Sequence, residues 1–161
     1  MTELFEIKKT TRDDIPLIFS FIKELAEYER LSHEVVATEE TLTKMLFGNK
    51  PYAEVVIGYL NNSPASFAIY FHNFSTFLAR PGLYLEDLFV KPEFRGQGLG
   101  QKMFVYLAQI AKDRQCGRLE WSVLDWNELA ISFYKRMGAK AMDEWTVYRA
   151  TGKALEDLAS L

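Results

Sequence analysis

The stretch RGQGLG, residues 95–100, combines an arginine with three glycines directly before an apolar run at helical spacing. Glycines let a backbone approach a ligand closely and adopt positive φ angles. The helix that follows would present unpaired N–H groups and the positive end of its dipole, which together bind anions. The stretch therefore predicts a loop that binds a diphosphate or a similar anion. The alternative is a glycine-rich turn without a ligand.

Two well-known phosphate motifs do not fit this stretch. A dinucleotide fingerprint, G-x-G-x-x-G, that starts at Gly96 and Gly98 requires glycine at position 101, where the sequence has Gln101. A Walker A loop requires Lys and then Ser or Thr after its last glycine, whereas Gly100 is followed by Gln101 and Lys102. The remaining description is R-x-x-G-x-G between a strand and a helix.

The elements around this loop follow a mixed α/β pattern. Apolar alternation predicts strands at residues 4–7, 52–59, 65–71, 83–90, 118–126 and 144–150. Apolar spacing of three and four predicts helices at residues 15–30, 38–47, 99–114 and 128–137. Residues 61–64 predict a hairpin turn and residues 74–82 a loop. This order indicates a mixed sheet with an antiparallel first half.

Composition limits the classes of function. A chain of 161 residues predicts one domain, residues 1–161. A net charge of −3 disfavours a nucleic-acid partner, which requires a basic surface. The single cysteine, Cys116, excludes an internal disulfide and fits the cytoplasm. No run of 18 apolar residues exists, so no membrane span is expected.

Three segments resemble the GNAT acetyltransferases. YLEDLFVKPEFRGQGLG, residues 84–100, is similar to their acetyl-CoA motif. WNELAISFYKRMGA, residues 126–139, is similar to their second conserved block, and more narrowly to that of the spermidine/spermine N-acetyltransferases. KELAEYE, residues 23–29, is similar to that subfamily's first helix. The resemblance implies an α/β acyl-CoA N-acyltransferase fold with a mixed central sheet of about six to seven strands and helices on both faces.

The resemblance implies acetyl-CoA as the co-substrate. In the family, the glycine loop binds the CoA pyrophosphate, and the preceding strand splays from its neighbour and pairs with the pantetheine arm. A further cofactor-contacting segment begins a later helix. The matching residues are Leu88, Phe89, Val90, Arg95, Gly96, Gln97, Gly98, Leu99, Gly100, Gln101, Asn127, Glu128, Leu129, Ala130 and Tyr134.

Acetyl transfer from a thioester to an amine requires two proton transfers. An alkyl ammonium has a pKa of about 10.4, so it must lose a proton before it attacks. Glu86 is the expected base, directly or through water, with Asp87 beside it. Neighbouring side chains of a strand point to opposite faces, so both carboxylates can share a pocket only if the strand is bulged. The alternative for this pair is a charged strand end.

Tyr134 matches the family's general acid and is expected to protonate the leaving thiolate. The alternative is an aromatic residue that packs in the core. An acyl-enzyme on Cys116 would require a nearby base, and neither histidine lies close to it in the sequence. We therefore expect direct transfer in a ternary complex, and no metal site.

By the same resemblance, acidic and aromatic side chains hold a small cationic amine. The matching substrate-binding residues are Tyr28, Glu29, Glu86, Asp87, Glu120, Trp121 and Ser122. Residues 73–82 depart from the polyamine enzymes, because they lack an acid and include Arg80. A lysine-like amino acid or thialysine therefore fits as well as a polyamine or diamine. We also expect a homodimer. A catalytically silent acyl-CoA-binding module and a protein-lysine acetyltransferase remain as alternatives.

Overall fold

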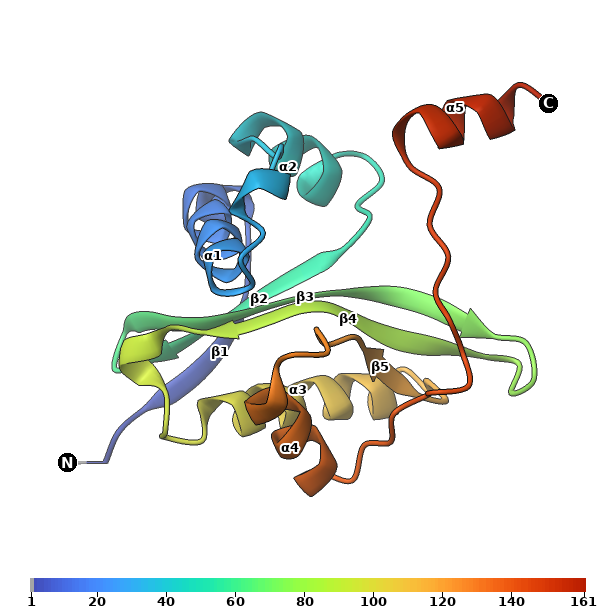
Figure 1. Ribbon diagram of the computed structural model, residues 1–161. Coiled ribbons are helices and arrows are strands. Elements are labelled where there is room, and N and C mark those ends of the chain that lie inside the picture. Colours follow the sequence, from blue (N-terminus) through green and yellow to red (C-terminus); the bar gives the residue numbers. More distant parts are fainter. Residues whose placement is uncertain (1) are drawn as a thin grey trace. The chain divides into compact units, whose positions relative to one another are not determined.

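The computed structural model describes residues 2–161 and divides after Ser122 into two compact units. The first unit contains one sheet of five strands in the order β1-β2-β3-β4-β5 (Figure 1). The strands are β1 Phe5–Lys9, β2 Glu54–Leu60, β3 Ser63–Ser75, β4 Arg80–Val90 and β5 Leu119–Trp121. The first four pair antiparallel with their sequence neighbours, and β5 pairs parallel to β4.

Three α-helices cover the two faces of this sheet. Helices α1, Ile15–Tyr28, and α2, Glu39–Phe47, lie on one face, and α3, Leu99–Asp113, lies on the other (Figure 1). Helix α3 is the crossover that a parallel pair such as β4 and β5 requires. Short 3-10 turns occupy Arg12–Asp14, Ser32–Glu34 and Pro92–Phe94.

The core forms because alternate strand residues face opposite helices. Val55 and Ile57 of β2 and Phe67 of β3 belong to a buried cluster with residues of α1. The rings of Phe21 and Phe67 stack with centroids 5.0 Å apart. The intervening residues, such as Val56, therefore point toward the face that α3 covers.

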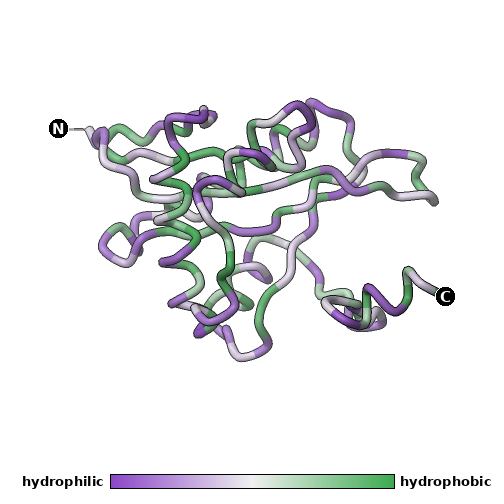
Figure 2. The backbone as a smooth tube through the Cα atoms, turned by 90° about the horizontal axis from the view of Figure 1, so that it is seen from above, coloured by the Kyte–Doolittle hydropathy of each residue, from purple (hydrophilic) through white to green (hydrophobic). Residues whose placement is uncertain are grey.

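The second unit contains α4, Glu128–Arg136, and α5, Gly152–Ala159. The last helix carries hydrophilic and hydrophobic residues along its length (Figure 2). Its leucines, Leu155 and Leu158, are more than half exposed at 54% and 59%. Within residues 2–161, no helix combines the length and the apolar character that crossing a membrane requires.

The predicted fold class is confirmed, and several predicted boundaries are wrong. The described sheet has five strands rather than six to seven, because residues 144–150 form no strand and β5 covers only part of residues 118–126. Residues 74–82, a predicted loop, lie largely in the β3–β4 hairpin, where pairing overrides the low strand propensity of Pro81 and Gly82. Helix α5 was missed, although its leucines three residues apart gave a weak signal.

Candidate active site

The glycine loop has the backbone that an anion site requires. Gly96 and Gly98 have φ angles of 79° and 76°, a conformation that costs other L-residues about 1–2 kcal/mol. A Cβ atom added to either glycine would meet no atom within 4 Å. The backbone angles, and not crowding, therefore demand glycine here, and the space beside the loop is open.

The loop leads directly into the first turn of α3. Gly98 is the N-cap residue, and its carbonyl accepts the first helical hydrogen bond from Lys102 N at 3.1 Å. The N–H groups of Leu99, Gly100 and Gln101 therefore have no acceptor within the helix. The Leu99 side chain is buried with Leu60 and Ala65, which fixes this turn against the sheet.

Arg95 lies beside the sheet edge and does not point along the loop. Its Nε donates a hydrogen bond to Val90 O at 2.9 Å. Its guanidinium carbon lies 4.8 Å from the ring centroid of Tyr28 and 5.3 Å from that of Phe89. These distances are typical of cation–π contacts. Arg95 thus connects the predicted cofactor loop to Tyr28, a predicted acceptor residue at the end of α1.

One edge of β4 is open next to the loop. The β4–β5 ladder ends at Leu85 and Trp121, so in the described chain no strand pairs with the later part of β4 on that side. Lys91 N donates to Ala65 O of β3 at 2.9 Å. Because backbone groups alternate in direction along a strand, those of Leu88 and Val90 point to the open edge, where Val90 O accepts the hydrogen bond from Arg95 Nε. This edge is suited to pair with an extended ligand.

Strand β4 contains a bulge at the predicted catalytic pair. Asp87 lies opposite Ile69, whereas the next β3 residue, Tyr70, lies opposite Leu85. Glu86 is therefore the extra residue of the bulge, which breaks the strict alternation of faces. The bulge that both carboxylates require in order to share a pocket is therefore present.

The charges of two nearby carboxylates act on Asp87 at the bulge. Burial first, and then the charges of Glu86 and Glu29, raise the pKa of Asp87 from 3.8 to about 7. Burial also raises the pKa of Glu29, which follows α1. A partly buried carboxylate with such a pKa is a candidate for proton transfer. Within residues 2–161, no group of three His, Cys, Asp or Glu side chains is arranged to hold a metal ion.

The predicted residues of β5 divide between the two faces of the sheet. Glu120 is paired with Tyr84, and the Tyr84 hydroxyl lies 2.9 Å from Ser122 Oγ. The Trp121 ring instead lies 4.8 Å from the Phe104 ring of α3. The structure therefore brings Glu120 and Ser122 to the face of Asp87 and places Trp121 on the opposite face.

Comparison with known proteins decides the family. The sequence profile of the Acetyltransferase (GNAT) family matches residues 19–139. The chain belongs to this family. This acetyltransferase is 37% identical to the thialysine N-epsilon-acetyltransferase of Bos taurus, over 95% of the chain and 96% of the relative. It is 32% identical to the L-ornithine N5-acetyltransferase of Arabidopsis thaliana, over 96% and 88%. The resemblance predicted from the motifs is confirmed.

A solved structure supports the same fold. An integron cassette protein from the mobile metagenome of V. cholerae superposes with a TM-score of 0.81 and 30% identity, over 98% of both chains. An aminoglycoside acetyltransferase from a soil metagenomic sample superposes with a TM-score of 0.76 at 18% identity, over 91% of this chain and 95% of the other. At that identity the second likeness concerns the fold alone.

The second unit of this acetyltransferase carries the remaining predicted residues. Asn127 Oδ1 accepts a hydrogen bond from Ala130 N at 3.3 Å and so caps α4. Leu129 is 84% exposed. Tyr134 is half-buried in α4, with its ring centroid 5.9 Å from that of Phe133. The cofactor and acid roles of these residues stay predictions.

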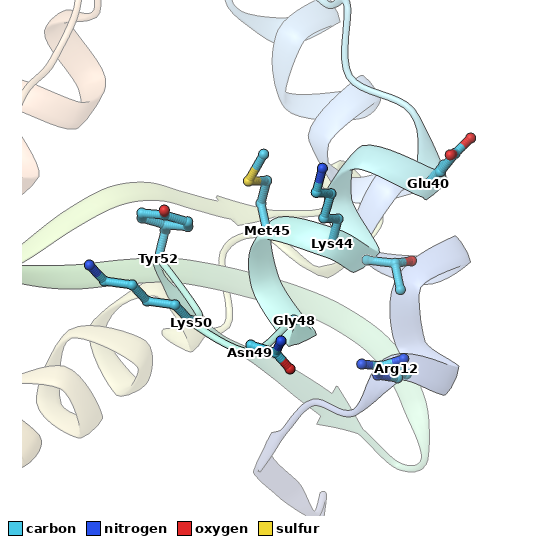
Figure 3. Close-up of a pocket in the computed structure, with 9 residues that line it drawn as sticks. Arg12, Glu40, Lys44, Met45, Gly48, Asn49, Lys50 and Tyr52 are labelled. Atoms are coloured by element: carbon cyan, nitrogen blue, oxygen red, sulfur yellow. The ribbon is translucent and has the colours of Figure 1, made fainter.

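A cavity of about 640 Å³ lies elsewhere, between the end of α2 and the start of β2 (Figure 3). Arg12, Lys44 and Tyr52 are among its lining residues. Arg12 Nη2 donates a hydrogen bond to Phe47 O at 2.7 Å, a favourable position for a cation at a helix C-terminus. None of the predicted site residues lines this cavity.

Around Glu120, on the face of Asp87, lie two polar residues that were not predicted from the sequence, Arg118 and Asn73. Arg118 Nε lies 2.7 Å from Glu120 Oε1, and Asn73 Nδ2 donates a hydrogen bond to the same oxygen at 3.2 Å. The spacing of Arg118 and Glu120, two residues apart in a predicted strand, was the available signal, because such residues share a face. The pairing with Asn73 could come only from the sheet register.

Proposed function

We propose that this enzyme transfers the acetyl group of acetyl-CoA directly to a primary amine of a small cationic acceptor, such as a polyamine, a diamine or a lysine-like amino acid. The observation that carries the proposal is the gathering of Glu29, Glu86 and Asp87 beside the open edge of β4. Negative side chains in a partly buried site attract an ammonium group. Relatives named for thialysine and L-ornithine support an amine acceptor of this size.

The open edge and the loop are suited to hold the co-substrate. The N–H groups at the start of α3 would bind its pyrophosphate, and the backbones of Leu88 and Val90 would pair with its pantetheine arm. Strand β4 runs from the bulge to the loop, and Val90 lies about 13 Å from Glu86 along it at 3.3 Å per residue. An arm that follows this edge therefore leads from the loop to the carboxylates. Acetyl-CoA supplies the thioester that the amine attacks.

The carboxylate pair at the bulge is suited to accept the acceptor's proton. Asp87 has a pKa of about 7, which is near the optimum for a general base at neutral pH. Glu86, the base expected from the sequence, is exposed at the bulge and contributes to that raised pKa. Because Glu86 lies beside Asp87 at the bulge, we assign proton acceptance to Glu86 and Asp87 together.

Two further parts of the proposal concern the second unit. We assign Tyr134 the protonation of the CoA thiolate, because a phenol can donate a proton to a developing anion. We also propose a homodimer in the cytoplasm. Trp145, Val147 and Tyr148 are 75%, 82% and 93% exposed, and clustered exposed apolar residues are typical of interaction surfaces.

An acceptor screen tests the proposed reaction. Release of free thiol from acetyl-CoA would be followed with spermidine, diamines, lysine and thialysine, and mass spectrometry would identify the acetylated product. We expect saturable release with at least one of these amines and a loss of release in the Glu86→Gln, Asp87→Asn double variant. Binding of CoA without turnover on any amine would instead support a catalytically silent module.

A further inference from the structure

We propose that Arg118 and Glu120 form a subsite that recognises the α-carboxylate and α-ammonium groups of an amino-acid acceptor. The inference rests on the proposed function, because it names the end of the acceptor that does not react. The subsite distinguishes a lysine-like amino acid from a diamine or polyamine of similar length.

The register of the sheet places the subsite on the face of Asp87. Gly82 pairs with Asn73 of β3, and the next residue of β4, Leu83, pairs with Leu119 of β5. A Cβ atom added to Gly82 would lie 2.2 Å from Asn73 Oδ1 and 3.2 Å from Arg118 Cγ. The side chains of Asn73 and Arg118 therefore meet over Gly82, and any larger residue there would separate them.

The next row toward the bulge contains Glu120. Phe71, Tyr84 and Glu120 lie side by side on β3, β4 and β5, and the Phe71 and Tyr84 ring centroids are 5.2 Å apart. Beyond this row come Ile69 and Asp87. The hairpin formed by β3 and β4 extends past α1 and α2 (Figure 1), so within the first unit no helix covers this part of the face.

The side chains of Arg118 and Glu120 remain accessible to solvent despite their contacts. Arg118 Nε contacts Glu120, and its Nη2 donates to Phe74 O at 3.3 Å. The side chains of Arg118 and Glu120 are 37% and 35% exposed. A guanidinium has five N–H donors in a planar fork, and this fork binds carboxylates well. The pair is therefore held in place by the sheet and still reaches solvent.

The charges of the pair match an α-amino acid. An arginine beside a glutamate presents one positive and one negative group, the reverse of an amino acid's carboxylate and ammonium. The end of a polyamine is only cationic, and it would meet Arg118 as a like charge. Arg80 belongs to the same set of alternate β4 residues as Gly82 and Tyr84, so it adds a second positive charge at this end of the face.

The spacing also fits a lysine-like acceptor. Glu120 lies opposite Tyr84, and Asp87 follows Tyr84 by three residues, of which one is the bulge residue. Two residue steps along the strand, about 7 Å, and one step of about 4.8 Å across to β5 separate the Asp87 and Glu120 positions by about 8–9 Å. The side-chain nitrogen of lysine is five bonds of about 1.5 Å from its Cα atom, or about 6 Å when extended. With a hydrogen bond of about 3 Å between its amine and Asp87, such an acceptor places its amino-acid end at the Arg118–Glu120 pair.

Three acceptors test this subsite. L-lysine is compared with cadaverine, which is lysine without its carboxylate, and with 6-aminohexanoate, which is lysine without its α-amino group. We expect kcat/KM of the acetyl-CoA-saturated enzyme to fall about tenfold or more for each lost group, the factor expected for one charge-assisted hydrogen bond. Arg118→Met should abolish the preference for lysine over cadaverine, and Glu120→Gln should abolish that for lysine over 6-aminohexanoate.

A matched variant controls for the loss of an arginine ion pair. Arg114, which follows α3, forms two hydrogen bonds with Glu54 of 2.6 and 2.9 Å, and Arg114→Met should keep the wild-type ratios. Equal kcat/KM values for the three acceptors in the wild-type enzyme would overturn the inference even if Arg118→Met does not fold. So would an equal fall for all three acceptors in a folded Arg118→Met protein.

A binding measurement separates this inference from the proposed reaction. Calorimetric titration of the CoA-saturated protein with the same three ligands reports the subsite without turnover. Tighter binding of lysine together with no acetyl transfer would refute the proposed function and support the subsite. Acetyl transfer to all three amines with equal affinities would support the function and refute the subsite.

Discussion

Removal of the buried charge at the bulge provides a quantitative test of the site. The pKa of Asp87 is raised from 3.8 to about 7, which corresponds to about 4 kcal/mol at 1.36 kcal/mol per pH unit. Because the side chain keeps some solvent contact, we expect about 1–3 kcal/mol to be realised. The raised pKa means that ionisation of Asp87 opposes folding. The contribution of Asp87 to wild-type stability is therefore greatest below about pH 4, decreases between about pH 4 and about pH 7, and changes little above that.

The Asp87→Asn variant has no such ionisation. Relative to the wild type, we expect it to gain about 1–3 kcal/mol in free energy of unfolding between pH 4.5 and pH 8.5. Urea denaturation followed by tryptophan fluorescence at both pH values measures this difference. Glu93→Gln, which neutralises an exposed carboxylate in the Pro92–Phe94 turn, is the control and should show no comparable gain.

The same variant must also lose activity. The neutral amide cannot accept a proton or attract an ammonium, so Asp87→Asn should lower kcat/KM for amines by about 10²-fold. A variant that is more stable at pH 8.5 and less active would show that the ionised Asp87 carboxylate destabilises the folded protein and is required for activity. An identical pH dependence of stability in wild type and variant would refute the buried charge, and full activity would refute its role.

Four other measurements test the site and the proposed assembly. The wild-type kcat/KM should rise with pH through an apparent pKa near 7, because Asp87 must be ionised to accept a proton; a profile that is flat between pH 6 and pH 8 would contradict this. Gly98→Ala should destabilise the loop by about 1–2 kcal/mol through its positive φ and weaken acetyl-CoA binding in calorimetry, and unchanged affinity would contradict the anion site. Tyr134→Phe should lower kcat about 10²-fold with little change in acetyl-CoA affinity, and unchanged turnover would remove the acid role. Light scattering after size exclusion should give twice the monomer mass of 18.6 kDa, and a monomer at micromolar concentration would exclude the proposed dimer.

The sequence by itself determined the parts of the site that depend on local backbone preference. Gly96 and Gly98 indicated positive φ angles before a helix, and both angles are present. Helices α1, α3 and α4 were predicted close to their observed bounds, because three- and four-residue apolar spacing requires one buried face. The motif order around Gly98 was sufficient to indicate the family.

The tertiary structure decided the features that depend on pairing between distant segments. The bulge at Glu86 arises from the register of β4 against β3. From the sequence it followed that Glu86 and Asp87 can share a pocket only at a bulge, but not that the strand contains one. Residues 144–150 have strand-like composition but form no strand, because a strand requires a neighbour to satisfy its backbone groups.

Contacts between side chains that are far apart in the sequence could not be predicted from the sequence either. Arg95 was expected at the cofactor loop, and its contacts with Tyr28 arise from the approach of the end of α1 to β4. Arg118 gained its neighbour Asn73 only because Gly82 lies between them in the folded sheet. Local spacing fixes which residues share a face, but the contacts across strands depend on a register that the whole sheet sets.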